Sequence, residues 1–204
     1  IFFKINFKKI VLMIAITVIT ISPYIIRNYL SFNKLVIHSG FGYNVWKAYN
    51  PKAKVEGYYI ETNDLKAKLK DVKKDIYYRF NEDKIYLDEA IKYISDEPEK
   101  YLVLFAKRLF AFYFYDTDSS QSNYYNSFHI YPILIFSILS LLGLLIYNKS
   151  NSKYNYLILI LFTLVIIYSS FAILPRYKIY ILPFQILLSI SGIKYLFEKL
   201  RIKN

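Results

Sequence analysis

The amino-acid sequence predicts an all-α integral membrane protein with about four transmembrane helices and an external α-helical segment between the first and the second. Three observations lead to this fold class. Four long apolar runs lack charged residues, a polar stretch of about one hundred residues separates the first two runs, and the excess of basic residues lies outside that stretch. A membrane-spanning helix needs about 20 mostly apolar residues, and the runs reach or approach that length.

The apolar runs cover residues 10–26, 130–147, 154–174 and 179–193. The fourth reaches spanning length once its flank through Phe197 is included, because a lysine at the end of a span can carry its ammonium group to the interface. A single run of this kind is also compatible with the core helix of a soluble protein. Four such runs in 204 residues favour a membrane protein. Cysteine is absent, which excludes disulfides and thiolate metal sites.

The distribution of charge predicts the orientation of the chain. The net charge is +12, yet residues 28–129 carry 15 basic against 14 acidic side chains, so the excess flanks the apolar runs. The flanking basic residues form three groups: Lys8 and Lys9; Lys149 and Lys153; and Lys199, Arg201 and Lys203. The positive-inside rule places all three groups in the cytoplasm if residues 28–129 and the turn at 174–178 lie outside. Nucleic acid is not an expected partner, because the pattern lacks a single basic and aromatic surface.

Three helices are expected within residues 28–129. Apolar side chains at helical spacing predict one helix over residues 64–80 and another over residues 84–94. Acidic residues around Pro98 mark the start of a third helix, near 99–115. This last helix is rich in Leu and Phe but carries Lys107 and Arg108 in its middle, so we expect it to lie in the plane of the membrane interface. A fifth span is the alternative.

The chain therefore divides into three parts. Residues 1–27 form the first transmembrane helix with its cytoplasmic flank, residues 28–129 form the external (periplasmic) helical segment, and residues 130–204 form a three-helix transmembrane region with a cytoplasmic C-terminus. The abundance of Ile, Lys, Asn and Tyr is typical of an AT-rich bacterial genome. Together with the four apolar runs, it predicts a multi-pass protein of the bacterial inner membrane. The chain begins at Ile1 without a signal-peptide pattern, so we expect it to belong to a longer protein.

Polar, aromatic and glycine residues gather where the predicted spans meet the outer surface. The motifs are SPYIIRNY at 22–29, GFGYNVW at 40–46, YNP at 49–51, Gly57, PRYK at 175–178 and Pro183. Each motif is short, but together they extend over most of the chain in a fixed order.

This order resembles the GT-C membrane glycosyltransferases related to protein mannosyltransferases, to the aminoarabinose transferase of lipid A and to RgtA/B/C/D-like enzymes. In that family a span ends in Pro-aromatic-x-x-Arg-Asn-Tyr, a Gly-rich segment with Asn-x-Trp and Asn-Pro follows, and an Arg-Tyr-Arg-like turn opens a late span that contains a proline. The matching residues are Pro23, Tyr24, Arg27, Asn28, Tyr29, Gly42, Asn44, Trp46, Asn50, Pro51, Gly57, Arg176, Tyr177 and Pro183. Lys178 stands where a second arginine is usual, and Ala48 and Tyr49 replace the more common Gly and Asn.

The resemblance implies that the chain is the C-terminal portion of an enzyme that moves a sugar from a polyprenyl-phosphate donor to a glycan, lipid or protein acceptor at the outer face of the membrane. Such a donor needs cations at the outer ends of spans, beside apolar grooves. Arg27, Arg176 and Lys178 lie there against the positive-inside bias and are the candidate donor-phosphate ligands. Cations that reach lipid phosphates are the alternative interpretation. The candidate sugar or lipid contacts are Tyr24, Asn28, Tyr29, Asn44, Trp46, Asn50 and Tyr177, with interfacial aromatics and an Asn-Pro turn as the alternatives.

No catalytic residue is predicted within this chain. The resemblance implies an acidic base in the first external loop of the whole enzyme, upstream of this chain, so we expect the chain alone to be inactive. Asp116 and Asp118 are candidate ligands of a divalent metal ion, with solvated loop acids as the alternative, and no other cofactor is predicted. A non-catalytic membrane protein with an external helical domain, an assembly partner or a degenerate remnant, is the alternative function. A transporter is disfavoured, because the runs contain no acidic residue.

Overall fold

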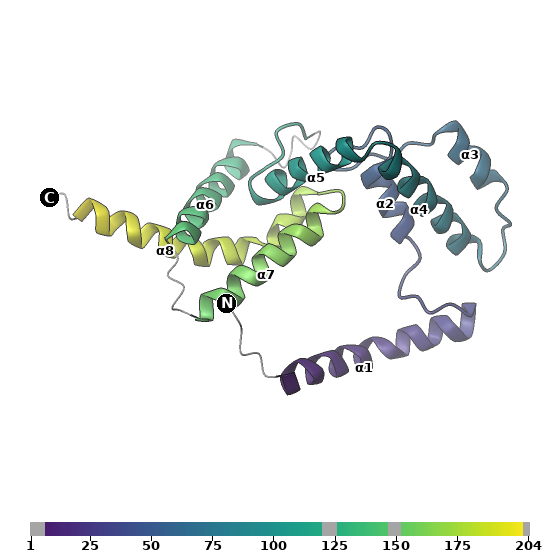
Figure 1. Cartoon of the computed structure of the whole chain (residues 1–204), viewed down its shortest axis with the longest axis horizontal. Coiled ribbons are helices and arrows are strands. Elements are labelled where there is room, and N and C mark those ends of the chain that lie inside the picture. The colour runs from purple at the N-terminus through teal and green to yellow at the C-terminus, as the bar shows by residue number, and fades with distance from the viewer. Residues whose placement is uncertain (1–6, 120–125, 147–151, 202–204) are drawn as a thin grey trace.

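The computed structural model describes residues 7–119, 126–146 and 152–201, and all regular structure in these residues is helical (Figure 1). The helices are α1 (Phe7–Phe32), α2 (Phe41–Tyr49), α3 (Asn63–Lys70), α4 (Tyr78–Asp96), α5 (Pro98–Tyr113), α6 (Ser127–Leu145), α7 (Ser152–Ser169), the 3₁₀ helix η1 (Pro175–Tyr180) and α8 (Leu182–Arg201). The all-α prediction is confirmed for this part of the chain. Lys149 and Lys203, which contribute to the predicted orientation, lie outside the described residues.

Two of the described helical segments are long and apolar enough to cross a membrane. They are Val11–Phe32 and Ser127–Leu145, and a third apolar segment, Tyr156–Ser169, is shorter. In α8, Lys194, Glu198 and Lys199 interrupt the apolar character. Two of the four predicted spans therefore match candidate spanning helices.

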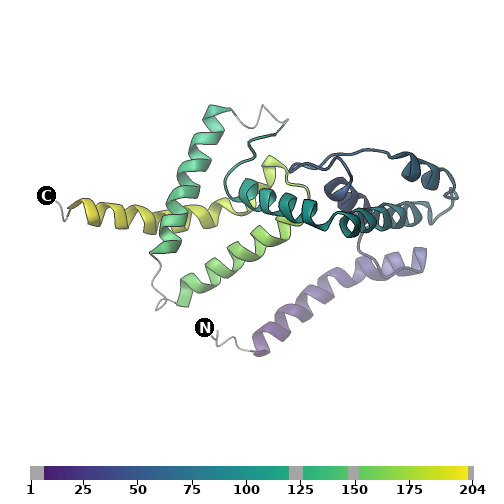
Figure 2. The same cartoon turned by 45° about the horizontal axis from the view of Figure 1, so that its top comes forward.

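Helix α1 lies apart from α5 to α8 in both views (Figures 1 and 2), and at its end the ring of Phe32 meets that of Phe80 of α4 with centroids 5.2 Å apart. Its apolar side chains face outward; Met13, for example, is 69% exposed. Its threonine hydroxyl groups are satisfied within the helix, because Thr17 and Thr20 donate to carbonyl oxygens one turn earlier, each at 2.8 Å. The surface of α1 is thus suited to an apolar environment such as lipid.

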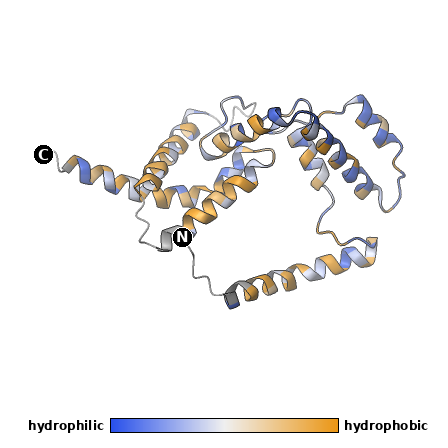
Figure 3. Ribbon diagram, viewed as in Figure 1, coloured by the Kyte–Doolittle hydropathy of each residue, from blue (hydrophilic) through white to orange (hydrophobic). Residues whose placement is uncertain are grey.

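Helices α2, α3 and α4 form a polar unit, and Figure 3 shows hydrophilic residues concentrated on α3 and α4. Its small core consists of Val45, Trp46, Leu65, Tyr86 and Ala90. Helix α2 approaches α4 so closely that a Cβ atom at Gly42 would lie 1.9 Å from the carbonyl oxygen of Asp83. Only glycine permits this contact, which fixes α2 against α4.

The single helix predicted over residues 64–80 is wrong. Helix α3 ends at Lys70, and α4 begins only at Tyr78. Between them, the carboxylate of Asp75 accepts a hydrogen bond from the backbone N–H of Tyr77 at 2.8 Å. A local side-chain bond of this kind competes with helical pairing, and it leaves Ile76 exposed instead of on a helical stripe.

Helix α5 corresponds to the helix predicted near 99–115, and Pro98 lies in its first turn as expected. Its two central cations have opposite environments: Lys107 is exposed, whereas the side chain of Arg108 is completely buried. The exposed surface of α5 also carries the apolar side chains of Leu102 and Phe110. A helix that exposes apolar residues beside a lysine is compatible with the predicted interfacial position.

Helices α5 to α8 share a second core, which consists of Phe112, Leu161, Val165, Ile173, Ile181 and Leu188. Within it, α6 crosses α8 in direct contact (Figure 2). A Cβ atom at Gly143 would lie 2.1 Å from the carbonyl oxygen of Leu188, and one at Gly192 would lie 2.3 Å from that of Leu139. Small residues allow helices to approach this closely, as is common between membrane helices.

Candidate functional site

The C-terminal end of α5 is buried and is capped by Lys178 of η1. The ammonium group of Lys178 donates to the carbonyl oxygens of Ala111 at 2.9 Å and Phe112 at 3.0 Å, and also to that of Phe114. These carbonyl groups lack partners within the last turn of a helix. Burial lowers the pKa of Lys178 to about 7, and the nearby carboxylate of Asp116 opposes this effect.

We expected Lys178 to bind a donor phosphate, but the structure directs its ammonium group to the backbone of α5 instead. It is buried, and its three N–H groups already have backbone acceptors. The remaining carbonyl of this turn, that of Tyr113, accepts from Gln185 at 2.9 Å and from Ser137 at 2.8 Å. The network joins α5 to η1, α6 and α8, so Lys178 has a structural position.

Trp46 and Asn50, two candidate sugar contacts, are also buried in structural positions. The indole N–H of Trp46 donates to the carbonyl oxygen of Ile60 at 2.9 Å. The amide of Asn50 donates to the carbonyl oxygens of Trp46, at 3.0 Å, and of Tyr58, and its oxygen accepts from the backbone N–H of Lys52 at 3.0 Å. The structure thus supports the turn interpretation of the Asn-Pro motif.

The candidates on α1 lie together but away from the others. The guanidinium of Arg27 lies over the ring of Tyr24, 5.3 Å from its centroid, and Tyr29 is exposed. Asn28 is buried, and its amide donates to the carbonyl oxygens of Val36 at 2.8 Å and Ile37 at 3.2 Å, which orders the segment after α1. Because α1 stands apart from η1 (Figures 1 and 2), the structure does not bring these residues together with Arg176.

The two candidate metal ligands, Asp116 and Asp118, form a local turn. The carboxylate of Asp116 accepts from the backbone N–H of Asp118 at 3.1 Å, and burial raises the pKa of Asp116. Among the residues that the structure describes, no group of three or more His, Cys, Asp or Glu side chains could hold a metal ion. The pair alone supplies fewer ligands than a calcium or magnesium site requires.

A cleft of about 330 Å³ lies between α2 and the segment from the end of α7 to η1; we call it the α2–η1 cleft. Four aromatic rings line it, those of Phe41, Tyr168, Phe171 and Tyr177, together with the polar side chains of Asn44, Lys47 and Glu56. Asn44 and Tyr177 are the two predicted site residues that the structure brings together here. They belong to two of the three parts of the chain that carry the motifs, residues 40–57 and 175–183.

Three contacts fasten these two parts to each other. The backbone N–H of Ile173 donates to the carbonyl oxygen of Val55 at 2.9 Å, and the hydroxyl of Tyr49 donates to the carbonyl oxygen of Ser170 at 2.7 Å. Gly57 has a φ of 76°, and a Cβ atom there would lie 2.5 Å from that of Ala172. Glycine is needed at this position for both its backbone conformation and the close approach.

The polar groups of the cleft are held in place. The ammonium of Lys47 lies 5.8 Å from the centroid of the Tyr43 ring, and Glu56 accepts a hydrogen bond from the hydroxyl of Ser119 at 2.8 Å. Exposed Arg176 lies over the ring of Tyr177, 5.6 Å from its centroid, and so stands beside the cleft. The site combines cations, a carboxylate and aromatic rings, which can bind a ligand with anionic, polar and apolar parts.

Lys47 and Glu56 were missed by the sequence interpretation. Lys47 directly follows Trp46 in the motif, and Glu56 directly precedes Gly57. Each lies between matched residues, in a segment predicted to be external. Their proximity to Tyr177 depends on the pairing of Val55 with Ile173, which no local pattern indicates.

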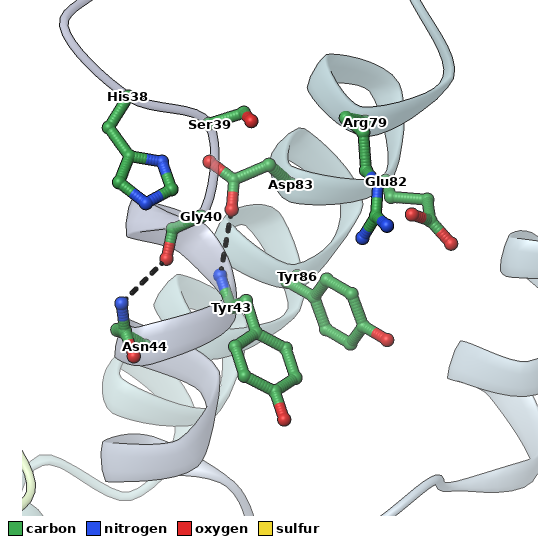
Figure 4. A pocket seen from close by; sticks show the side chains of 9 residues that line it. All are labelled: His38, Ser39, Gly40, Tyr43, Asn44, Arg79, Glu82, Asp83 and Tyr86. Carbon is green, nitrogen blue, oxygen red and sulfur yellow. Dashed lines mark hydrogen bonds between the residues drawn. The ribbon is translucent and has the colours of Figure 1, made fainter.

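A second cavity, of about 500 Å³, lies between α2 and α4; we call it the α2–α4 pocket (Figure 4). The carboxylate of Asp83 accepts a hydrogen bond from the backbone N–H of Tyr43 at 2.9 Å, at the start of α2. The N-cap residue of α2, Gly40, has no side chain to do so. Asp83 therefore caps α2 from α4.

Comparison with known proteins finds that no protein-family model, no curated protein and no solved structure matches this chain.

Proposed function

We propose that this chain is the C-terminal portion of a membrane glycosyltransferase that transfers a sugar from a polyprenyl-phosphate donor to an acceptor at the outer face of the bacterial inner membrane. In this proposal α1, α6, α7 and α8 span the membrane, and residues 28–129 lie in the periplasm. The observation that supports it best is the α2–η1 cleft, which is lined by side chains from two of the three motif-bearing segments, 40–57 and 175–183.

The chemistry of the cleft suits each part of such a donor. A phosphate group forms strong, charge-assisted bonds with an ammonium group, which Lys47 supplies within the cleft and Arg176 supplements at its edge. Asn44 and Glu56 offer hydrogen bonds to sugar hydroxyls, while the four rings offer apolar surface to a sugar face or to isoprenoid units. Lys178 is not in this set, because it caps α5.

The cleft is also connected to the apolar helices. Tyr168 belongs to α7, and Tyr177 belongs to η1, which directly precedes α8. A donor with its phosphate in the cleft would lie beside the ends of two proposed spans, where its tail can enter the lipid. Arg27 lies on α1, away from the cleft, and in this proposal it binds lipid phosphates instead.

The test is a transfer assay with the full-length protein in lipid nanodiscs and a series of radiolabelled polyprenyl-phosphate sugars. We expect Lys47→Ala and Arg176→Ala each to reduce transfer about tenfold or more, since a charge-assisted bond contributes about 1.5–3 kcal/mol. Lys66→Ala is the matched control: Lys66 is exposed on α3 and lines no described cleft, so transfer is expected at the wild-type rate.

Two results would overturn the proposal. One is a wild-type protein that transfers no sugar from any of the donors, which would favour the non-catalytic alternative. The other is a Lys47→Ala variant that transfers as fast as the Lys66→Ala control.

A further inference from the structure

The α2–α4 pocket has a lining that differs from that of the α2–η1 cleft. Rings of Tyr43 and Tyr86 line it together with the polar side chains of His38, Ser39, Arg79 and Glu82 (Figure 4). No lysine is among its lining residues, although the ammonium of Lys47 lies 5.8 Å from the centroid of the Tyr43 ring. The volume of about 500 Å³ falls within the range of small-ligand sites. The pocket thus presents aromatic surface, hydrogen-bond donors and acceptors in one place.

The tyrosine rings are held by one another. The rings of Tyr43 and Tyr86 meet edge to face with centroids 5.4 Å apart, and the ring of Tyr59 lies 5.5 Å from that of Tyr43. The hydroxyl groups of Tyr59 and Tyr86 are 3.1 Å apart, and Tyr59 also donates to Glu61 at 2.8 Å. Tyr43 remains 37% exposed, so a ring in a fixed orientation is available to a ligand.

The charges of the pocket select against an anionic ligand. The start of α2 is the place where a phosphate would otherwise bind, and the carboxylate of Asp83 already occupies it, 2.9 Å from the N–H of Tyr43. Glu82 adds a second carboxylate, and Arg79 is the lining cation. Carboxylates repel phosphate, but they accept hydrogen bonds from the hydroxyl groups of a ligand. The guanidinium of Arg79 can donate hydrogen bonds to the same kind of hydroxyl group.

We propose that the α2–α4 pocket binds an uncharged saccharide, with one sugar face on the ring of Tyr43 and its hydroxyl groups bonded to Arg79 and Glu82. Saccharides combine an apolar face of C–H groups with a rim of hydroxyl groups, which matches this combination of fixed aromatic rings and paired donors and acceptors. Asn44 lines both this pocket and the α2–η1 cleft, so a saccharide bound here borders the site proposed for the donor. Only the position of this saccharide beside the donor site rests on the proposed function.

Saturation-transfer difference NMR on the full-length protein in lipid nanodiscs tests this inference. The probes are cellobiose and N-acetylglucosamine as neutral saccharides and glucose 6-phosphate as the anionic comparison; sugar-based detergents are avoided. We expect both neutral probes to give signals with a Kd of about 1 mM, and glucose 6-phosphate to give at least threefold weaker signals. Arg79→Ala and Tyr43→Ala should each reduce the neutral-probe signals at least threefold, whereas Lys66→Ala should leave them unchanged.

The inference is overturned if neither neutral probe gives a signal, if glucose 6-phosphate binds as well as they do, or if Arg79→Ala binds like wild type. Arg79 is exposed, so its variant keeps the test decisive even if Tyr43→Ala does not fold. A protein that transfers sugar from a polyprenyl-phosphate donor but binds no neutral probe would refute this inference and leave the proposed function standing.

Discussion

The ammonium group of Lys178 lies 2.9 Å from the carbonyl oxygen of Ala111, at the C-terminal end of α5. This contact fixes η1 against α5, and η1 carries Tyr177, one of the rings of the α2–η1 cleft. Lys178, which the sequence suggested as a substrate-binding cation, thus stabilises the position of a helix that lines the cleft. Its removal should affect stability before it affects any ligand contact.

Lys178→Met is expected to reduce the free energy of unfolding by about 2–4 kcal/mol, because it leaves buried carbonyl groups without a donor. The control is Lys194→Met, since the side chain of Lys194 is 78% exposed and its ion pair with Glu198 is weak, with an N–O distance of 3.9 Å. Thermal unfolding in nanodiscs provides the comparison. Equal melting temperatures for the two variants would show that the cap contributes nothing.

The same lysine predicts a pH dependence of stability. Burial lowers the pKa of Lys178 to about 7 in the folded protein, whereas a lysine in an unfolded chain has a pKa of about 10.4. Between these values the unfolded state binds the proton and the folded state does not, so stability rises with pH; below about pH 7 the cost of burying the charge is fully present. From pH 7 to pH 9.5 the melting temperature of the wild type should therefore rise relative to Lys178→Met. A difference that stays constant with pH contradicts this.

Arg108 joins α5 to the end of α2 and to the segment that follows it. Its guanidinium donates to the carbonyl oxygens of Ala48 at 2.6 Å and Lys54 at 3.0 Å, and it lies 5.1 Å from the centroid of the Tyr49 ring. Burial lowers the pKa of Arg108 to about 10, so the group remains charged at neutral pH. Arg108→Ala should lower the free energy of unfolding by about 3 kcal/mol, because it leaves a cavity at a fully buried position and two carbonyl groups without a donor. Lys107→Ala, at the adjacent exposed position, should change it by less than about 0.5 kcal/mol. Chemical denaturation of both variants measures the difference.

The proposed topology can be tested with single cysteines, because the chain contains none. In intact cells, a membrane-impermeant maleimide should label Lys66→Cys on α3, which we place in the periplasm. It should label Glu198→Cys on α8 only after the membrane is made permeable. Labelling of both positions in intact cells, or of neither, would contradict the predicted orientation.

The sequence predicted features that depend on local patterns better than features that depend on distant contacts. Pro98 in the first turn of α5 follows from a local signal, and the structure has it there. The single helix predicted over residues 64–80 is wrong because α3 already ends at Lys70, and the bond from the backbone N–H of Tyr77 to Asp75 belongs to the turn before α4. In that case a local turn interrupts the apolar periodicity.

At the candidate site, the sequence showed which residue types are present, but it did not show the role of each residue. Trp46 and Asn50 are the kinds of residue that bind sugars, yet their polar atoms bond to the backbone at Ile60 and Tyr58. Lys47 and Glu56 reach the α2–η1 cleft only because distant parts of the chain pair with each other. Whether a polar side chain caps the backbone or faces a ligand is decided by tertiary structure, and no spacing in the sequence encodes it.

Photolabelling tests the central claim, that the α2–η1 cleft holds a polyprenyl-phosphate donor, most directly. A polyprenyl phosphate with a diazirine beside its phosphate group is irradiated with the full-length protein in nanodiscs, and cross-linked residues are identified by mass spectrometry. We predict labels within residues 41–56 and 168–177 that decrease with excess unlabelled polyprenyl phosphate and with Lys47→Ala, but not with Lys66→Ala. Labels confined to α1 and α6, with a yield that neither the competitor nor Lys47→Ala changes, would contradict the claim.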